Sequence, residues 1–224
     1  HCDTTLKLIT IFVDTSKMER IPLQVRLKRE IHRKIAYAQD IIVKEVYSAV
    51  PKAVLHGGTA IWRCYQGKRF SEDIDFYLPK DREKIDLLFE NIQKKGFAVV
   101  KKKISDASVY SELEIGRVSV RLEATFQKIK GVICDYELSD GNFISIYSLT
   151  SEQFAIEKAI TYLKRLKVRD LWDIFFLLKI IENPEKIKEI GKLIKSYKKP
   201  IDEDNLKAIL LEGIVPTARE MIDY

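Results

Sequence analysis

The chain has 224 residues, of which 46% are hydrophobic and 32% are charged, and it carries a formal net charge of +6 at pH 7. This composition is ordinary for a globular protein with a sizeable core, in one large domain or two small ones. No apolar run approaches the length of a membrane span and the three cysteines form no C-x-x-C pair, which excludes a transmembrane segment, a zinc knuckle and a dithiol redox site. The basic excess argues weakly for an anionic partner, and unpaired cysteines favour the cytoplasm.

The first 50 residues are expected to form a strand and then a helix that pack on the domain that follows. Residues 5–14, TLKLITIFVD, have the pattern of a short strand. Residues 21–50 carry apolar side chains at helical spacing, with Pro22 near the start and Pro51 directly after the end.

Residues 51–149 have the pattern of a mixed α/β domain. An apolar run closed by two glycines predicts a strand over 53–58, and a short helix is expected to start at Thr59. A further strand over 73–78 stops before Pro79. An amphipathic helix is expected over 81–95, with Gly96 as its C-cap.

The rest of this domain is expected to be strands, and the chain then becomes helical. Strands are predicted over 97–104, 109–115 and 117–126, followed by a hairpin that pairs 134–138 with 143–149. Thr150 and Gln153 form a capping box, and two helices with a break near Lys167 and a Lys-rich helical tail are expected to follow. The fold class is therefore α+β, with a mixed sheet in the core and a C-terminal helical domain over 150–224.

Two aspartates in the strand over 73–78 are the first candidate site residues. Asp73 and Asp75 point to one face of the strand, while Ile74 and Phe76 point to the other. Two carboxylates that close repel each other unless protons or a cation lie between them. Mg²⁺ takes oxygen ligands, often one or two carboxylates together with substrate phosphates. We therefore expect Mg²⁺ here, with Mn²⁺ as a substitute.

The glycines before the short helix are suited to the phosphates themselves. Gly57 and Gly58 let backbone N–H groups approach an anion, the helix N-terminus favours negative charge, and Thr59 adds a hydroxyl. A third carboxylate is expected from Glu123, which shares one strand face with Arg121. Three carboxylates can hold two metal ions, and Glu123 is also a candidate base for the attacking hydroxyl.

Each of these signals has an ordinary explanation when it stands alone. A D-x-D is usually a solvated strand end, a glycine pair is usually a turn, and Glu123 could pair with Arg121 at the surface. A glycine pair that precedes a D-x-D across one small helix is much more specific than either part.

Two motifs resemble a known family. The stretch GGTAIWRCYQGKRFSEDIDF over 57–76 resembles the signature of the DNA polymerase beta-like nucleotidyltransferase superfamily, and GGTA with RFSEDIDF resembles the AbiEii/AbiGii toxin family. That family also carries a lysine, an arginine two turns later and then R-D-x-x-D, which EKAITYLKRLKVRDLWD over 157–173 matches. The resemblance covers roughly residues 30–180. Gly58 and Thr161 depart from the commonest residues of these patterns, and the third acid is Glu rather than Asp.

The resemblance implies a polymerase beta-like nucleotidyltransferase core and a Mg²⁺-dependent transfer of a nucleoside monophosphate from a nucleoside triphosphate to an acceptor hydroxyl. It also implies the toxin of a toxin–antitoxin pair, with tRNA 3′ ends as the acceptor and an antitoxin protein as a separate chain. Asp73, Asp75, Glu123 and Lys158 are the expected catalytic residues, the first three as metal ligands. The expected nucleotide-binding residues are Gly57, Gly58, Thr59, Arg69, Lys158, Arg165 and Asp173, and those expected to orient the site are Ser71, Arg169 and Asp170.

The helical motif has a physical interpretation beside the resemblance. Lys158, Tyr162 and Arg165 share one helix face, which would present cations to a triphosphate. Asp170 and Asp173 share a face of the next helix, where they either hold basic side chains in place, which we favour, or contact the nucleotide base. Arg69 is equally suited to a phosphate and to a neighbouring acid.

Two other functions remain open from the sequence. The first is a nucleotidyltransferase that acts on a small molecule or on a protein hydroxyl, including its own. The second is a catalytically silent homologue that binds nucleotide or RNA, although the presence of all three carboxylates argues against it.

Overall fold

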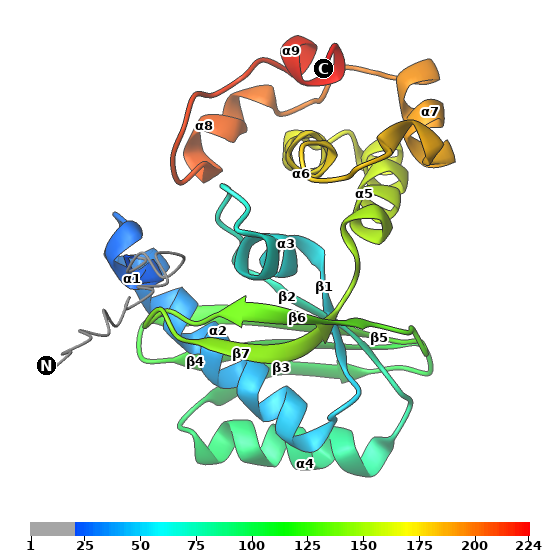
Figure 1. Ribbon diagram of the computed structural model, residues 1–224. Helices are drawn as coiled ribbons and strands as arrows, with labels where there is room; N and C mark the ends of the chain where they lie inside the picture. The colour runs from blue at the N-terminus through cyan, green and yellow to red at the C-terminus, as the bar shows by residue number, and fades with distance from the viewer. Residues whose placement is uncertain (1–20) are drawn as a thin grey trace, which may run out of the picture.

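A seven-stranded mixed sheet forms the centre of residues 21–224, which are the residues that the computed structural model describes (Figure 1). Its strand order is β3-β4-β5-β2-β1-β7-β6, in which β2 is parallel to β5, β1 is parallel to β7, and the other neighbours are antiparallel. The strands are β1 Val54–His56, β2 Ile74–Leu78, β3 Ala98–Ile104, β4 Ser108–Ile115, β5 Val118–Phe126, β6 Val132–Glu137 and β7 Phe143–Ser148. The strand predicted over 5–14 lies outside the described residues.

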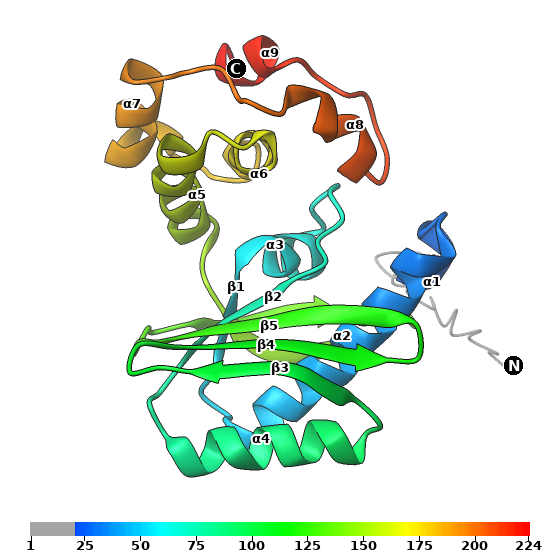
Figure 2. The ribbon, with the colours of Figure 1, turned by 180° about the vertical axis from the view of Figure 1, so that it is seen from behind.

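Helices cover both faces of this sheet, as the two views show together (Figures 1 and 2). Helices α2 (Glu30–Ala49) and α4 (Arg82–Lys94) lie on one side, and α3 (Gly57–Tyr65) lies on the other, together with the C-terminal helices. Those helices are α5 Ser151–Arg165, α6 Val168–Leu178, α7 Lys188–Lys195, α8 Leu206–Ile209 and α9 Ala218–Ile222. The fold class predicted from the sequence, a mixed-sheet α+β core followed by helices, is confirmed.

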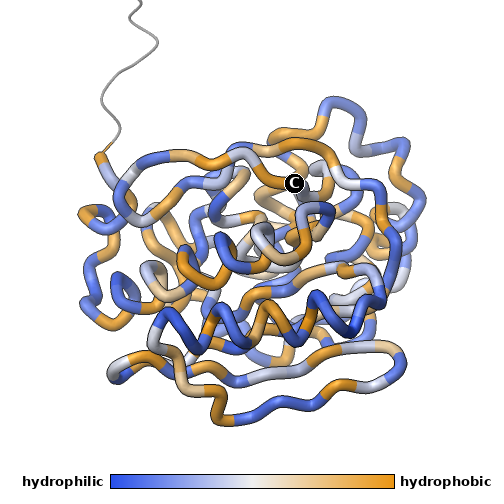
Figure 3. The backbone as a smooth tube through the Cα atoms, turned by 90° about the horizontal axis from the view of Figure 1, so that it is seen from below, coloured by the Kyte–Doolittle hydropathy of each residue, from blue (hydrophilic) through white to orange (hydrophobic). Residues whose placement is uncertain are grey.

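Alternating burial explains why the central strands form where they do. In β2, Ile74, Phe76 and Leu78 are buried, whereas Asp75 and Tyr77 are half-buried on the face that α3 covers. Seen from the side of α4, hydrophobic and hydrophilic positions also alternate along the helices, as expected of amphipathic helices that cover a sheet (Figure 3). No helix among residues 21–224 is long and apolar enough to cross a membrane.

Three details differ from the sequence prediction. The helix predicted over 21–50 is broken into α1 (Leu23–Arg26) and α2, because the buried Leu27 is extended and its carbonyl accepts a hydrogen bond from Arg33. Helix α3 begins at Gly57, two residues earlier than predicted, and Gly57 itself has a φ of +74°, which favours glycine there. The tail forms short helices and 3₁₀ turns rather than a longer helix, and prolines at 184, 200 and 216 interrupt it.

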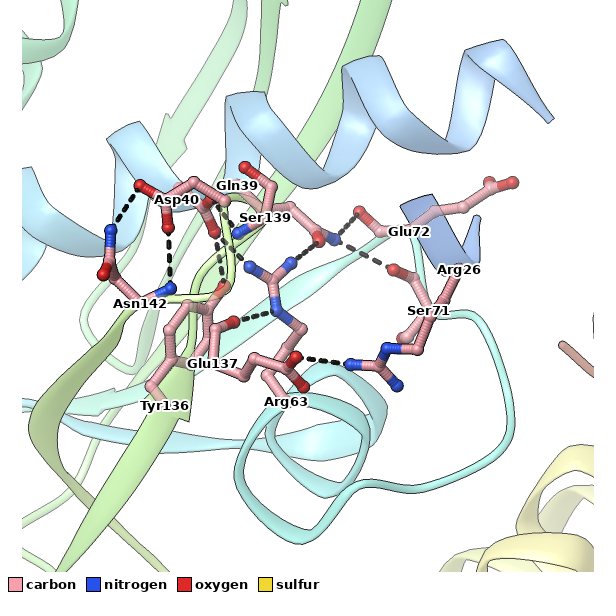
Figure 4. A network of polar contacts seen from close by, with 11 residues as sticks. Arg26, Gln39, Asp40, Arg63, Ser71, Glu72, Tyr136, Glu137, Ser139 and Asn142 are labelled. Carbon is pink, nitrogen blue, oxygen red and sulfur yellow. Dashed lines mark hydrogen bonds and ion pairs between the residues drawn. The ribbon is translucent and has the colours of Figure 1, made fainter. Parts of the chain in front are cut away.

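A buried polar network fixes α3 against the rest of the α/β domain (Figure 4). The Arg63 side chain on α3 is fully buried, donates to the Glu137 carbonyl at 2.6 Å and forms an ion pair with Asp40 on α2. The other Asp40 oxygen accepts from the backbone N–H of Ser139 at 2.7 Å. Gln39 then donates to the carbonyls of Ser71 at 2.9 Å and Glu72 at 3.0 Å. The network therefore also holds the loop that leads to Asp73.

We predict that Arg63→Met lowers the free energy of unfolding by about 3–5 kcal/mol, because it leaves the buried Asp40 carboxylate without its cation. Urea denaturation measures this change. Lys34→Met is the matched control, because the Lys34–Glu30 pair on α2 is 53% and 70% exposed and a surface pair contributes about 1 kcal/mol or less. An Arg63→Met protein as stable as the control would contradict the positioning role of the network.

Candidate active site

A pocket of about 450 Å³ opens between the N-terminal end of α3, strands β2 and β5, and helix α5. Most of its lining is polar. The residues that line it are His56, Gly57, Gly58, Arg69, Ser71, Asp73, Asp75, Tyr77, Arg121, Glu123, Glu157, Lys158, Ile160, Thr161, Arg165 and Arg169. It therefore brings together three motifs that are far apart in the sequence: the glycine pair, the three carboxylates and the basic helix.

The glycine pair shapes one wall of the pocket. A Cβ at Gly57 would lie 2.2 Å from Oδ2 of Asp75, and a Cβ at Gly58 would lie 2.3 Å from Nη2 of Arg69 and 2.7 Å from Oγ of Ser71. Only glycine allows the backbone to come so close to these groups. No side chain caps α3, so the N–H groups of its first turn remain available to an anion.

Sheet register places two of the carboxylates side by side. Asp75 on β2 is the direct partner of Glu123 on the parallel strand β5. Burial raises the pKa of Asp75, against the opposing charges of His56 and Lys158. Burial also raises the pKa of Glu123, and the charge of Asp75 adds to that effect. The pair therefore sits where an additional positive charge would be strongly favoured.

The third carboxylate makes an ion pair of its own. Arg121, two residues before Glu123 on β5, donates from Nε to Asp73 Oδ1 at 2.7 Å and from Nη2 to Asp73 Oδ2 at 2.5 Å. This bidentate contact holds Asp73 at the mouth of the pocket, where its side chain is 22% exposed.

The carboxylates match Mg²⁺ or Mn²⁺ in chemistry, because hard divalent cations take carboxylate oxygens, and Asp73, Asp75 and Glu123 line one pocket. Within residues 21–224, however, no three acidic, histidine or cysteine side chains are already arranged as a metal site. Both oxygens of Asp73 accept hydrogen bonds from Arg121, so a cation held by Asp73, Asp75 and Glu123 would compete with Arg121 for them.

A chain of buried ion pairs forms the opposite wall. Lys158 Nζ on α5 lies 2.7 Å from Asp173 Oδ2 and 3.2 Å from Asp170 Oδ1, both on α6. Asp173 also accepts two hydrogen bonds from Arg69, at 2.9 and 2.7 Å. Asp170 accepts two from Arg165, at 2.7 and 2.8 Å. Three cations share two carboxylates, so this wall keeps an excess of positive charge next to the pocket.

The two acids of this chain lie behind the pocket and do not line it. Asp170 and Asp173 have side chains that are 0% and 3% exposed, and both bind basic residues that do line the pocket. Burial acts to raise the pKa of Asp173, but the charges of Arg69 and Lys158 outweigh it and the pKa is lowered. The contacts thus favour a positioning role for both acids over contact with a nucleotide, and Arg69 is paired with an acid.

Two other expected residues also face away from the pocket. The Thr59 hydroxyl donates to the backbone carbonyl of Asp73, and its side chain is fully buried, so it ties α3 to β2 rather than facing a ligand. Tyr162 does not present a polar group beside Lys158, because its ring is buried and its hydroxyl donates to the Lys198 carbonyl at 2.6 Å.

Six residues that line the pocket were not expected from the sequence as site residues: His56, Tyr77, Arg121, Glu157, Ile160 and Thr161. Arg121 could have been found, because it lies two residues from Glu123 on the same strand face. His56 stacks on Tyr77 with ring centroids 3.9 Å apart, and its Nδ1 lies 3.4 Å from Oε2 of Glu157. Tyr77 donates to the other oxygen of Glu157 at 2.5 Å. No short motif signals this second cluster, since β1, β2 and α5 each contribute one residue to it.

Comparison with known proteins identifies the family. The model of the nucleotidyl transferase AbiEii toxin family, of the type IV toxin–antitoxin systems, matches residues 47–220. The chain belongs to the AbiEii family. The family assignment made from the two motifs is thereby confirmed, and the protein is a nucleotidyltransferase.

Solved structures show the same fold. The nucleotidyltransferase toxin MenT4 from Mycobacterium tuberculosis is 21% identical, with a TM-score of 0.55, over 80% of this chain and 72% of that one. JHP933 from Helicobacter pylori is 19% identical, with a TM-score of 0.59, over 87% of this chain and 88% of that one. A putative nucleotidyltransferase from Helicobacter pylori is 20% identical, with a TM-score of 0.62, over 87% and 91%. No curated protein matches the AbiEii chain by sequence.

We predict that Gly58→Ala lowers kcat/KM for nucleotidyl transfer at least about tenfold, because its methyl group would displace Arg69 or Ser71 and a shift of about 1 Å can cost about 100-fold. Steady-state kinetics at varied nucleotide concentration measure this loss. Gly191→Ala on α7 is the control, because a Cβ there meets nothing within 4 Å. Unchanged kinetics in Gly58→Ala would contradict the claim that close packing of Gly58 against Arg69 and Ser71 positions the site for catalysis.

We predict that Asp75→Asn raises the free energy of unfolding in the presence of a chelator, and that the gain increases with pH. The folded-state pKa of Asp75 lies above its ordinary 3.8, so ionisation opposes folding as the pH rises above that value, whereas Asn cannot ionise. Urea denaturation of both proteins at pH 5 and pH 8 measures the difference.

The exposed Asp86 is the control of opposite sign. Hydrogen bonds from Arg82 and Lys102 lower its pKa, so Asp86→Asn loses stability at pH values above the ordinary carboxyl pKa. A loss of stability in Asp75→Asn at pH 8 would contradict the assignment of Asp75 as a buried carboxyl whose ionisation opposes folding.

Proposed function

We propose that this AbiEii-family nucleotidyltransferase uses Mg²⁺ to transfer a nucleoside monophosphate from a nucleoside triphosphate to the 3′-terminal hydroxyl of tRNA, and that an antitoxin protein opposes it. The observation that carries the proposal is the single pocket in which the glycine pair, three carboxylates and Lys158 meet. A transfer to tRNA and the free cysteines Cys64 and Cys134 are compatible with action in the cytoplasm.

One wall of the pocket is suited to the phosphates of the nucleotide, and the other is suited to the divalent cation. The N–H groups of the first turn of α3 face the phosphates, and Lys158 and Arg165 bring positive charge from α5. Asp73, Asp75 and Glu123 would hold the divalent cation, which supplies positive charge to the phosphate that is attacked and lowers the pKa of the attacking hydroxyl.

The transfer itself requires a base and a leaving group. The acceptor oxygen forms a bond to the α-phosphorus, the bond from that phosphorus to the bridging oxygen of the β-phosphate breaks, and pyrophosphate leaves with that electron pair. The hydroxyl proton passes to the Glu123 carboxylate, whose raised pKa suits a general base. Lys158, held by Asp170 and Asp173, faces the charge that builds on the phosphoryl oxygens.

The net charge supports an RNA acceptor, and the family supports an antitoxin partner. The formal charge of +6 favours a polyanionic acceptor over a neutral small molecule. An antitoxin follows from the toxin–antitoxin family to which the chain belongs.

We predict that the purified protein incorporates label from at least one α-labelled nucleoside triphosphate into tRNA in the presence of Mg²⁺. Asp75→Asn and Lys158→Met should each lower this incorporation at least about 100-fold, because each removes charge stabilisation at the reacting phosphate. Lys164→Met is the control on α5, since Lys164 is exposed and does not line the pocket.

Other results would separate the alternatives. Label on the protein itself or on a small molecule, with none on tRNA, would contradict the tRNA acceptor and favour the first alternative. Unchanged incorporation, toxicity and nucleotide binding in Asp75→Asn would contradict the assignment of the catalytic site.

A further inference from the structure

A second pocket of about 300 Å³ adjoins the candidate active site. The two pockets share Arg69, Ser71, Asp73, Arg121 and Arg169 in their linings. The bidentate Arg121–Asp73 pair is thus a common wall, with the first pocket on one side and the second on the other. A molecule in the second pocket would lie next to the carboxylates without occupying the space at Gly57 and Lys158.

The second pocket is basic, and two of its arginines have no ion-pair partner among residues 21–224. Four arginines line it, against the two acids Glu72 and Asp73. Arg69 is paired with Asp173 and Arg121 with Asp73, whereas Arg29 and Arg169 make no ion pair with any residue of the range 21–224. Arg29 is exposed at the start of α2. As far as residues 21–224 are concerned, both guanidinium groups are therefore available to a phosphate.

An aromatic surface lies beside these cations. The His32 ring stacks on Phe70 with centroids 3.8 Å apart and an angle of 12° between the rings, and both residues line the pocket. Phe70 is buried and His32 is half-buried, so the stack fixes the orientation of the imidazole. Burial and the nearby Arg29 lower the pKa of His32, which favours the neutral ring. A fixed aromatic ring next to free guanidinium groups is suited to a single-stranded nucleic acid.

We propose that the second pocket binds the 3′-terminal nucleotides of an RNA acceptor, with Arg29 and Arg169 on its phosphates and His32 against a base. The inference rests on the proposed nucleotidyl transfer, because it assigns the side from which the acceptor hydroxyl reaches the α-phosphate. In-line attack requires the acceptor to enter from the side opposite the leaving pyrophosphate. With the triphosphate at the start of α3, an acceptor in the second pocket would approach it past Asp73 and Arg121, which line both pockets.

The test is RNA binding measured separately from nucleotide binding. The probe is a fluorescent RNA hairpin with a single-stranded 3′ end, titrated with protein and followed by anisotropy without nucleoside triphosphate. Arg29→Gln should weaken binding several-fold and reduce the slope of log K against log salt by about 0.7, the value for one phosphate contact on a single strand. His32→Ala should weaken binding about tenfold through loss of one stacked base.

Lys34→Gln is the matched control, because it removes the same charge from α2 at a residue outside the second pocket. Affinity for a fluorescent non-hydrolysable nucleoside triphosphate should be unchanged in Arg29→Gln, since Arg29 does not line the first pocket. Thermal melting of His32→Ala checks that loss of the stack on Phe70 has not unfolded the chain.

The outcomes separate this inference from the proposed function. RNA affinities of Arg29→Gln and His32→Ala equal to that of Lys34→Gln would overturn the subsite, even if wild-type protein labels tRNA. A wild-type protein that does not bind the hairpin would overturn it as well. Weakened RNA binding in both variants would support the subsite even if no transfer to RNA were found, and the failure would then lie with the proposed reaction.

Discussion

A chain of ion pairs around two buried carboxylates, from Arg69 through Asp173, Lys158 and Asp170 to Arg165, joins the helical part of the molecule to the α/β domain at the pocket. Its two carboxylates are almost fully buried, so the loss of any one cation would leave an uncompensated charge away from water. The chain therefore fixes Lys158 and Arg69 in place, and its excess of cations over carboxylates gives the pocket one wall that attracts phosphates.

The facing wall has the opposite electrostatic character. Asp75 and Glu123 are register partners on parallel strands, and Asp73 is neutralised by Arg121. Burial disfavours the charged forms of Asp75 and Glu123, so their ionisation lowers the stability of the folded chain. Carboxyl groups perturbed in this way are typical of active sites. A polyanion that carries a divalent cation would satisfy both walls at once, with its phosphates toward Lys158 and the cation toward the carboxylates. A nucleotide with its divalent cation therefore accounts for the opposite charges of the two walls.

Much of this arrangement could be predicted from the sequence, because local patterns determine it. Alternation in β2 places Asp75 on one face of the strand and Ile74 and Phe76 on the other. Two glycines at the start of a helix indicate an anion site. The partners of the basic helix could not be fixed in the same way, since the packing of α6 against α5 decides that Asp173 holds Arg69 and Lys158. The start of α3 was missed by two residues, because the positive φ of Gly57 and its close approach to Asp75 are features of the folded chain that the sequence pattern does not encode. The Arg121–Asp73 pair depends on strand register, which no single-strand pattern encodes.

We propose that the triphosphate binds between the start of α3 and Lys158 and that a divalent cation displaces Arg121 from Asp73. A crystal structure with a non-hydrolysable nucleoside triphosphate and Mg²⁺ tests this arrangement. We expect phosphate oxygens on the N–H groups at Gly57 and Gly58 and near Lys158 Nζ, with Asp73, Asp75 and Glu123 around the metal and Arg121 released. A triphosphate bound elsewhere, or an intact Arg121–Asp73 pair beside bound nucleotide and metal, would contradict it.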